Sequence, residues 1–314
     1  MQKGVKFRIY PNKEQQTIIN QTLGCCRLIY NKGLAMHNEA YQNGNKIGYS
    51  QTSAMLTDLK KSDDFAFLKA VDSIALQQSL RDLDRGFVNF FQKRASHPTF
   101  KSKHNHHQSY RTINQGDNIR IVGKYIKLPK LGFVKIRQTM GVEKINNVTI
   151  EHTPTNKYFA VLNVKFEPQP MSNKGSKIGI DVGIKEFYSD SNGNVVYNPK
   201  YLEKSMRKLI REQRNLSRKE KGSTNRNKQR VKVALVHEKI TNQRNDFLQK
   251  QSTMLIRENQ TICIEDLKVK NMMRNHKLAQ HIGSASWSKF FDMLSYKSVW
   301  YGNDIVKVPT MYPS

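Results

Sequence analysis

Two short runs of β-branched and apolar residues, each carrying an acid, constrain the fold of this chain more than any other feature. The first run is Lys177–Ile184, which contains Asp181, and the second is Thr261–Glu265. Runs of this length and composition are typical of buried strands. An acid at the end of a buried strand costs desolvation free energy unless it binds a metal ion or accepts hydrogen bonds. The pattern therefore predicts either metal-ligating acids or acids that cap neighbouring backbone groups.

The chain is also strongly basic. Its 314 residues include 53 Lys and Arg against 25 Asp and Glu, a formal net charge of +28. This length predicts about two domains with enough chain for a substantial core. So large an excess of one sign indicates a polyanion partner, most simply nucleic acid. A well-solvated basic surface is the competing interpretation, and a membrane partner is disfavoured because the sequence has no long apolar stretch.

The cysteines exclude two kinds of scaffold. Cys25, Cys26 and Cys263 contain no Cys-x-x-Cys pair, so they form neither a disulfide framework nor a zinc site. We expect three inert core thiols and no zinc. The first residues lack the apolar segment of a secretory signal, and a reducing, cytoplasmic compartment fits.

Periodicity divides the first 170 residues into a helical insert between β-rich segments. Residues 4–10 alternate apolar and basic side chains, which predicts a half-buried strand. Apolar residues then recur at helical spacing through most of 11–98. From 99 to 170, short alternating runs separated by Gly, Asn and Pro predict a small β-barrel or sheet that the first strand also joins. The polar segment Pro168–Ser176 marks the expected domain boundary.

The second half predicts a different architecture. A strand and an Asn-Gly hairpin open it, and two helices with apolar stripes follow over 200–257 as an antiparallel hairpin. A strand leads to Glu265, and a helix from Ala285 to about Tyr301 precedes a last strand. This order is that of an RNase H-type nuclease core, in which acids on two strands and a final helix hold Mg²⁺ ions beside a phosphate.

Motifs along the whole length resemble one family. The chain is similar to TnpB, the transposon-encoded RNA-guided nuclease related to the type V CRISPR effectors. Segments that carry the resemblance include Gly24-Cys-Cys-Arg-Leu-Ile-Tyr-Asn31, Ala75-Leu-Gln-Gln-Ser-Leu-Arg-Asp-Leu83, Lys127-Leu-Pro-Lys-Leu-Gly132, Gly179-Ile-Asp-Val-Gly183, Ile264-Glu-Asp-Leu267 and Trp300-Tyr-Gly302.

The resemblance implies an α+β multi-domain fold. Residues 1–10 and 99–170 match a β-barrel wedge domain, 11–98 a helical recognition domain, and 171–314 an RNase H-like RuvC domain with the helical hairpin 200–257. Asp181 and Glu265 match the first two catalytic acids of that domain.

The family pattern also predicts a departure. Relatives continue past a segment like Met311-Tyr-Pro-Ser314 into a zinc ribbon and a helix that carries the third acid, whereas this sequence ends before both. We therefore expect a RuvC domain without the ribbon and the last catalytic helix. Asp181 and Glu265 would be vestigial ligands that hold one Mg²⁺ at most.

The implied function is RNA-guided DNA binding. A guide RNA would direct a monomer to double-stranded target DNA beside a short flanking motif, without cleavage, so that the protein acts as a nucleoid-associated transcriptional repressor. One alternative is a transposon-associated RNA-guided endonuclease with residual RuvC activity, in which an acid such as Asp266 replaces the missing ligand. Another is a relic that only binds transposon RNA.

Candidate nucleic-acid contacts are cations on the expected surface and polar or aromatic residues at positions where relatives meet the flanking motif. For each single Lys or Arg, a solvated charge is the competing interpretation. Tyr49 and Tyr110 lie in polar stretches and are predicted to stack on bases, whereas Phe7, Tyr10 and Tyr30 are predicted to be core. The full set is Lys6, Arg8, Arg27, Lys32, Tyr49, Ser53, Ser73, Gln77, Arg81, Arg85, Tyr110, Arg111, Thr112, Lys127, Lys130, Arg207, Arg211, Arg214 and Arg218.

Overall fold

Two large hydrophobic cores organise the part of the chain that the structure describes. The structure is a computed structural model that describes residues 1–142, 144–168, 170–171 and 175–309. The chain falls into two units, Met1–Phe166 and Glu167–Ser314. In the first unit the predicted helical insert shares one core with the sheet, since Ile19 and Leu76 of the helices cluster with Phe7 and Leu162 of the strands. The segment Met311–Ser314 lies outside the described residues.

The first unit contains a seven-stranded sheet that is antiparallel throughout. Its order is β2-β6-β7-β1-β5-β4-β3, so the strand at the N-terminus pairs with strands from the second β-rich segment, as predicted. The strands are β1 (Gln2–Tyr10), β2 (Gln108–Ile113), β3 (Arg120–Val122), β4 (Tyr125–Leu128), β5 (Gly132–Arg137), β6 (Ile145–His152) and β7 (Tyr158–Lys165).

The sheet is curled and has two edges, where the sequence had suggested a barrel. Among the described strands, β2 and β3 do not pair with each other. Asn114, which follows β2, bridges this gap with its side chain. Its Nδ2 donates to the carbonyl oxygens of Ile119 and Ile145, and its Oδ1 accepts from the Ile119 amide.

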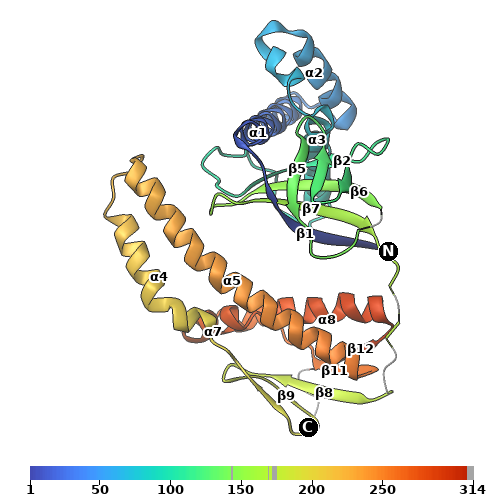
Figure 1. Cartoon of the computed structure of the whole chain (residues 1–314), viewed down its shortest axis with the longest axis vertical. Coiled ribbons are helices and arrows are strands. Elements are labelled where there is room, and N and C mark those ends of the chain that lie inside the picture. The colour runs from blue at the N-terminus through green and yellow to red at the C-terminus, as the bar shows by residue number, and fades with distance from the viewer. Residues whose placement is uncertain (143, 169, 172–174, 310–314) are drawn as a thin grey trace. The chain divides into compact units, whose positions relative to one another are not determined.

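Helices pack on the sheet of the first unit (Figure 1). They are α1 (Lys13–Gln42), α2 (Tyr49–Lys61), a 3₁₀ turn (Asp63–Lys69) and α3 (Ser73–Phe91). Asn12 and Gln15 cap α1 reciprocally, and the side chain of Asp72 caps α3. Helix α2 begins at Tyr49, after Gly48.

The second unit contains a five-stranded mixed sheet of order β10-β9-β8-β11-β12. Strands β8, β11 and β12 are parallel, and β8, β9 and β10 are antiparallel. The strands are β8 (Lys177–Val182), β9 (Glu186–Asp190), β10 (Val195–Tyr197), β11 (Thr261–Glu265) and β12 (Asp304–Val308).

Helices α5 and α8 share the second core with the isoleucines of β8 and β11. The predicted helical hairpin is present as α4 and α5, and the helix predicted from Ala285 to about Tyr301 is α8, which begins at Trp287 after Ser286, whose φ is 58°. The buried Lys297 fastens α8 to α5 by donating to the Gln249 carbonyl and to the hydroxyls of Ser252 and Thr253. The helices are α4 (Tyr201–Ser217), α5 (Thr224–Glu258), α6 (Val269–Met272), α7 (His276–Ala285) and α8 (Trp287–Tyr301).

Candidate functional site

Asp181 and Glu265 lie side by side in the second sheet. Strands β8 and β11 are parallel neighbours, and Ile180 stands opposite Ile264 at the end of their register. One position farther along both strands, Asp181 stands beside Glu265. Neighbouring strands are separated by about 4.8 Å, so the backbones of these two acids are adjacent although they are distant in sequence.

Both acids face away from the helices. Side chains alternate between the two faces of a strand, and the residues just before the acids, Ile180 and Ile264, are buried in the core that α5 and α8 share. Asp181 and Glu265 therefore point to the opposite face of the sheet. There Asp181 is exposed and Glu265 is half-buried.

A close backbone turn fixes the end of β8 just after Asp181. The Gly183 amide donates to the Phe187 carbonyl at 3.3 Å. A Cβ on Gly183 would lie 2.9 Å from the Glu186 carbonyl oxygen, closer than side-chain carbons normally approach. Only glycine lets the chain reverse this tightly, which sets where the strand ends and where its acid sits.

The two carboxylates have the chemistry of a small Mg²⁺ site. In the described part of the chain, neither carboxylate has a hydrogen-bond or ion-pair partner. Mg²⁺ prefers oxygen ligands and is commonly held by one or two carboxylates, with water and substrate phosphate completing its shell. The pair therefore fits one hydrated Mg²⁺ ion.

Asp266 does not complete the pair as a third ligand. Its carboxylate lies 3.9 Å from the Nζ of Lys307. Lys307 pairs with Ile264, so its side chain is on the helix side of the sheet, opposite to Glu265. Among the described residues, no group of three His, Cys, Asp or Glu side chains could hold a metal ion. The sequence-based suggestion that Asp266 substitutes for a missing acid is therefore not supported.

One exposed stripe on α3 gathers four of the candidate nucleic-acid contacts. Ser73, Gln77, Arg81 and Arg85 are spaced by four residues and all are exposed. The guanidinium of Arg81 stacks over the ring of Tyr49, the first residue of α2, at 4.3 Å from the ring centroid. Arg81 thus covers one face of the ring that was predicted to stack on bases.

A neighbouring contact ties the two helices together. The Nζ of Lys60, near the end of α2, donates to the Ser73 hydroxyl at the start of α3. Ser53, also in α2, is half-buried. The α2–α3 region therefore presents Tyr49, Ser73 and Gln77 on a surface that is held by interhelical contacts.

Tyr110 and Thr112 are not surface residues. They alternate with Ser109 and Arg111 in β2 and face the core, where they are 6% and 1% exposed. Burial raises the pKa of the Tyr110 hydroxyl far above its usual value. Neither side chain can meet nucleic acid in this structure, and the alternation in Gln108–Ile113 is the signal that could have shown this.

Several candidate cations already have partners within the first unit. Lys6 is ion-paired with Glu151, and Arg111 with Asp82. The Lys32 ammonium lies 4.8 Å from the ring centroid of Phe65. Arg27 and Lys127 are half-buried, and Lys130 is exposed.

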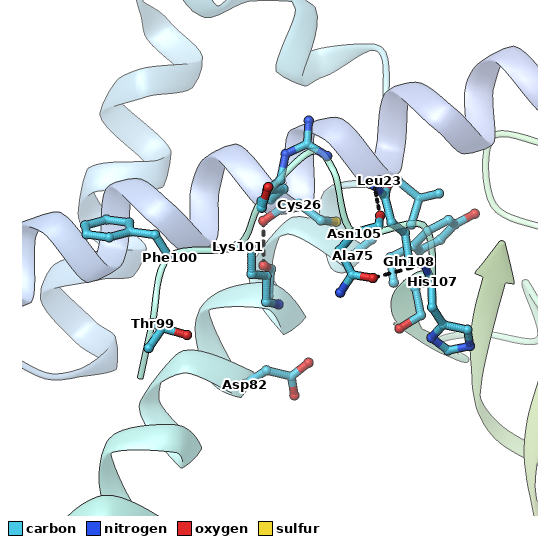
Figure 2. Close-up of a pocket in the computed structure, with 15 residues that line it drawn as sticks. Leu23, Cys26, Ala75, Asp82, Thr99, Phe100, Lys101, Asn105, His107 and Gln108 are labelled. Atoms are coloured by element: carbon cyan, nitrogen blue, oxygen red, sulfur yellow. Dashed lines mark hydrogen bonds between the residues drawn. The ribbon is translucent and has the colours of Figure 1, made fainter. Parts of the chain in front are cut away.

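Arg27 borders a pocket of about 410 Å³ between α1, α3 and residues 99–110 (Figure 2). Figure 2 shows Lys101 and Asp82 at this pocket. The Lys101 backbone is fixed by the Asn31 side chain, which both donates to its carbonyl and accepts from its amide. The walls combine cations, an acid and backbone groups, so the pocket is polar and offers charged groups to an anion.

The helical hairpin of the second unit exposes the remaining candidates. Arg207, Arg211, Arg214 and Arg218 are all exposed along one side of α4, while Leu209 of the same helix packs on Val236 and Ile240 of α5. The Nη2 atom of Arg211 lies 3.4 Å from the Oε1 atom of the neighbouring Glu212. This hairpin therefore has an apolar seam and a basic outer side.

Tyr10 was misassigned by the sequence analysis. Phe7 and Tyr30 are buried as predicted, but Tyr10 is 43% exposed at the end of β1. The alternation of β1 gives the reason, since odd positions face the core and even positions face outward.

Comparison with known proteins identifies two family models that match parts of the chain. A family model described as "Probable transposase" matches residues 148–276, and one described as a helix-turn-helix domain matches residues 1–46. In the structure residues 1–46 contain β1 and the single continuous helix α1. No helix in the described ranges has the length and apolarity needed to cross a membrane.

Two curated relatives match the chain over nearly its whole length. A Streptomyces pristinaespiralis protein named "Putative RNA-guided DNA endonuclease" is 39% identical and covers 100% of this chain and 79% of its own length. The Escherichia coli K12 protein InsQ, with the same kind of name, is 34% identical over 98% of this chain and 81% of its own length.

A solved structure shares the fold. The cryo-EM structure of a Cas12f1–sgRNA–target DNA complex aligns with 98% of this chain and 89% of its own, with a TM-score of 0.54 and 13% sequence identity. At this identity the likeness concerns the fold alone.

Proposed function

The chain belongs to the TnpB family, and from this premise we propose that it is an RNA-guided DNA endonuclease. A bound guide RNA would pair with one strand of target DNA, and the protein would cut beside it. The names of the two full-length relatives support this reading more than the non-cleaving repressor that the sequence analysis put first.

The observation that carries the proposal is the register of Asp181 with Glu265. Two parallel strands place both carboxylates on the same open face of the sheet, one exposed and one half-buried. Acids that serve only to cap backbone groups would show hydrogen bonds to them. None is present for either carboxylate in the ranges that the structure describes.

Asp181 and Glu265 are the residues that would hold Mg²⁺. When bound, the ion would polarise a phosphate oxygen and lower the pKa of a coordinated water. The two carboxylates would attract cations to this face of the sheet. The tight turn at Gly183 keeps Asp181 at the level of Glu265.

The two units would divide the work of binding. We assign residues 1–10 and 99–170 to a wedge domain, 11–98 to a recognition domain, and 171–314 to a RuvC-like domain. The net charge of +28 supports contact with many phosphates, which position nucleic acid without reading its sequence. On this proposal the protein works at DNA, together with a guide RNA that supplies sequence specificity.

The α2–α3 surface is the proposed reader of the flanking DNA motif. Ser73 and Gln77 present a hydroxyl and an amide one helical turn apart on α3, and an amide can hydrogen-bond an adenine edge. Replacing Gln77 with Ala should change which flanking sequences are recovered when the guide-loaded protein selects its DNA from a library with a randomised flank. Replacing Thr57 with Ala on the exposed side of α2 is the control, because that hydroxyl already donates to the Ser53 carbonyl.

A cleavage assay tests the main proposal. RNA that co-purifies with the protein is sequenced to identify the guide, and DNA carrying the matching sequence beside a randomised flank is incubated with the complex and Mg²⁺. We expect cutting that stops when EDTA is added. Asp181→Asn and Glu265→Gln should each reduce cutting by at least about 100-fold, because the remaining carboxylate holds the ion poorly.

The variants also separate cleavage from binding. Both should bind matched DNA within about twofold of the unaltered complex, since removing an exposed negative charge does not weaken phosphate contacts. Tight, RNA-dependent binding without any cutting by the unaltered protein would favour the repressor. DNA binding that ignores the RNA sequence would overturn the RNA-guided reading altogether.

A further inference from the structure

One lysine of the first unit lies against a pocket rather than in open solvent. Lys101 lines the pocket of about 410 Å³ between α1, α3 and residues 99–110 (Figure 2). The residue as a whole is exposed, but its Nζ lies 3.9 Å from the ring centroid of Tyr30, which is buried. Lysine side chains are flexible and normally keep the ammonium group in water. The position of this amine therefore needs an explanation in terms of what the pocket does.

The backbone of Lys101 is fixed in place by one side chain of α1. Asn31 donates to the Lys101 carbonyl at 3.0 Å and accepts from the Lys101 amide at 2.8 Å. Figure 2 shows the side chain of Lys101 extending toward α3, where Asp82 lies. Because the backbone is anchored and the amine lies against a ring, the reactive atom is positioned before any ligand arrives, which lowers the entropic cost of a reaction there.

The surroundings of the amine favour its neutral, nucleophilic form. Burial lowers the pKa of Lys101, and the negative charge of Asp82 opposes this shift without reversing it. Part of the Asp82 charge is already compensated, because its carboxylate is ion-paired with Arg111. Only the neutral amine attacks a carbon centre, so a lysine whose pKa is lowered holds a larger reactive fraction at neutral pH.

The same pocket offers groups that can bind a phosphoryl group. Arg27 of α1 borders it, and Ser102 and His107 add polar side chains. A guanidinium can hold phosphate oxygens with two parallel hydrogen bonds. The volume of the pocket is within the range of small-molecule sites, roughly 300–1,000 Å³. A small molecule with a phosphoryl group at one end and an electrophilic carbon at the other can therefore meet a cation and the amine of Lys101 together.

We propose that Lys101 is a covalent modification site that takes the acyl group of a small acyl phosphate bound in this pocket. The amine nitrogen attacks the carbonyl carbon and forms a C–N bond. The bond from that carbon to the phosphate oxygen breaks, inorganic phosphate leaves with the electron pair, and the amine proton passes to water. The product is an uncharged amide, so the pocket loses one positive charge and with it part of its attraction for anions.

Lys60 shows why burial alone does not make such a site. Burial lowers the pKa of Lys60 as well. Its Nζ, however, donates to the Ser73 hydroxyl, and the residue does not line the pocket. Lys103 lies two residues beyond Lys101, is exposed and is also outside the lining. Lys60 therefore tests a lowered pKa without the pocket, and Lys103 tests the same surface segment without the pocket.

The test incubates the full chain with acetyl phosphate and follows the acetylation of each lysine by peptide mass spectrometry. Lys101 should react at least about tenfold faster than Lys60 and Lys103, because a bound donor reacts at a high effective concentration. Its rate should level off as the acetyl phosphate concentration rises, whereas the rates at the other two lysines should rise in proportion. Inorganic phosphate should slow the reaction at Lys101 alone, because it competes for the same cation.

Two variants alter the pocket in opposite directions. Arg27→Gln should slow acetylation of Lys101 by acetyl phosphate at least about fivefold, because the donor loses its guanidinium. Asp82→Asn should speed the reaction, because the charge that favours the ammonium form is removed. Acetic anhydride, which has no phosphoryl group, should label Lys101 equally in the unaltered protein and in Arg27→Gln. The phosphate competition uses the unaltered protein, so the inference stays testable if a variant does not fold.

Two results would overturn the inference. Lys101 could be acetylated no faster than Lys103, which would show an ordinary surface lysine. It could also react faster but without saturation and without protection by phosphate, which would show a reactive amine that has no donor site. None of these measurements uses guide RNA or target DNA, so the inference stands or falls separately from the endonuclease activity.

Discussion

The ionisation of Tyr188 links the stability of the second core to pH. Its side chain is 1% exposed in β9, and its hydroxyl donates to the Gln251 side chain at 3.0 Å. Burial, together with the nearby charges of Asp190 and Glu258, raises the pKa of Tyr188 to about 12. A tyrosine that is harder to ionise in the folded state than in the unfolded chain stabilises the fold only while it stays protonated.

The sign of this effect gives a prediction. The unfolded pKa of a tyrosine is about 10, so its contribution is complete below pH 10 and is lost as the pH rises through 12. The free energy of unfolding of the unaltered protein, measured with denaturant and taken relative to that of Tyr188→Phe, should therefore fall between pH 10 and pH 12. A difference that stays constant over this interval would contradict the prediction.

The residue types in the sequence were enough to single out two candidate metal ligands. They were not enough to show which candidate nucleic-acid contacts are exposed. Asp181 and Glu265 were found because acids beside buried strands are unusual. Tyr110 was misplaced because its polar neighbours suggested a surface, whereas the strand pairing with β6 turns it inward.

At the scale of elements, the turn between β8 and β9 fixes the end of the strand that carries Asp181, one of the two proposed metal ligands. Gly183→Ala would bring a Cβ within 2.9 Å of a backbone oxygen that cannot move without shifting β9. We expect this change to lower the free energy of unfolding by about 1–3 kcal/mol. It should also reduce cleavage, because the end of β8 must shift.

Gly179→Ala is the control for this prediction. It lies in the same strand, and its new Cβ would be 3.8 Å from the Ser191 Cβ, an ordinary contact. Alanine is also preferred to glycine inside a strand. Denaturant unfolding should show this variant to be as stable as the unaltered protein, and equal losses in both variants would show that the turn is not special.

Element boundaries could be predicted where local chemistry sets them and not elsewhere. Asp72 caps α3 by accepting from the Ile74 amide, a local signal that the sequence displays. The break at Ser286 has no such signal, since it needs a left-handed backbone at a serine. That conformation is accompanied by a contact from Arg244 on α5, which only the folded chain provides.

At the scale of the whole molecule, the excess of cations determines how strongly the affinity for DNA falls with salt concentration. If about ten phosphates of double-stranded target DNA are neutralised, the log–log slope of affinity against salt should be near −9. Measuring the dissociation constant of the guide-loaded complex from about 50 to 300 mM salt gives this slope. A slope near zero would contradict a role for the basic surface in binding.

The basic side of α4 can be tested within the same measurement. Replacing Arg207, Arg211, Arg214 and Arg218 by Gln should make the slope less negative by about 3–4 if each side chain meets a phosphate. A matched quadruple of exposed polar residues on α5, Thr241, Asn242, Asn225 and Asn227, replaced by Ala should leave the slope unchanged.

The separation of the two cores has a consequence for genetics. The first core is built entirely from Met1–Phe166, whereas the isoleucines beside the two acids belong to the second. A large-to-small change such as Ile262→Ala should loosen the second unit alone and, on the proposed function, give an allele that cuts at low temperature and fails on warming. If the first unit keeps its RNA, such an allele would be dominant over the unaltered gene in the same cell, because it would withhold the shared guide without cutting.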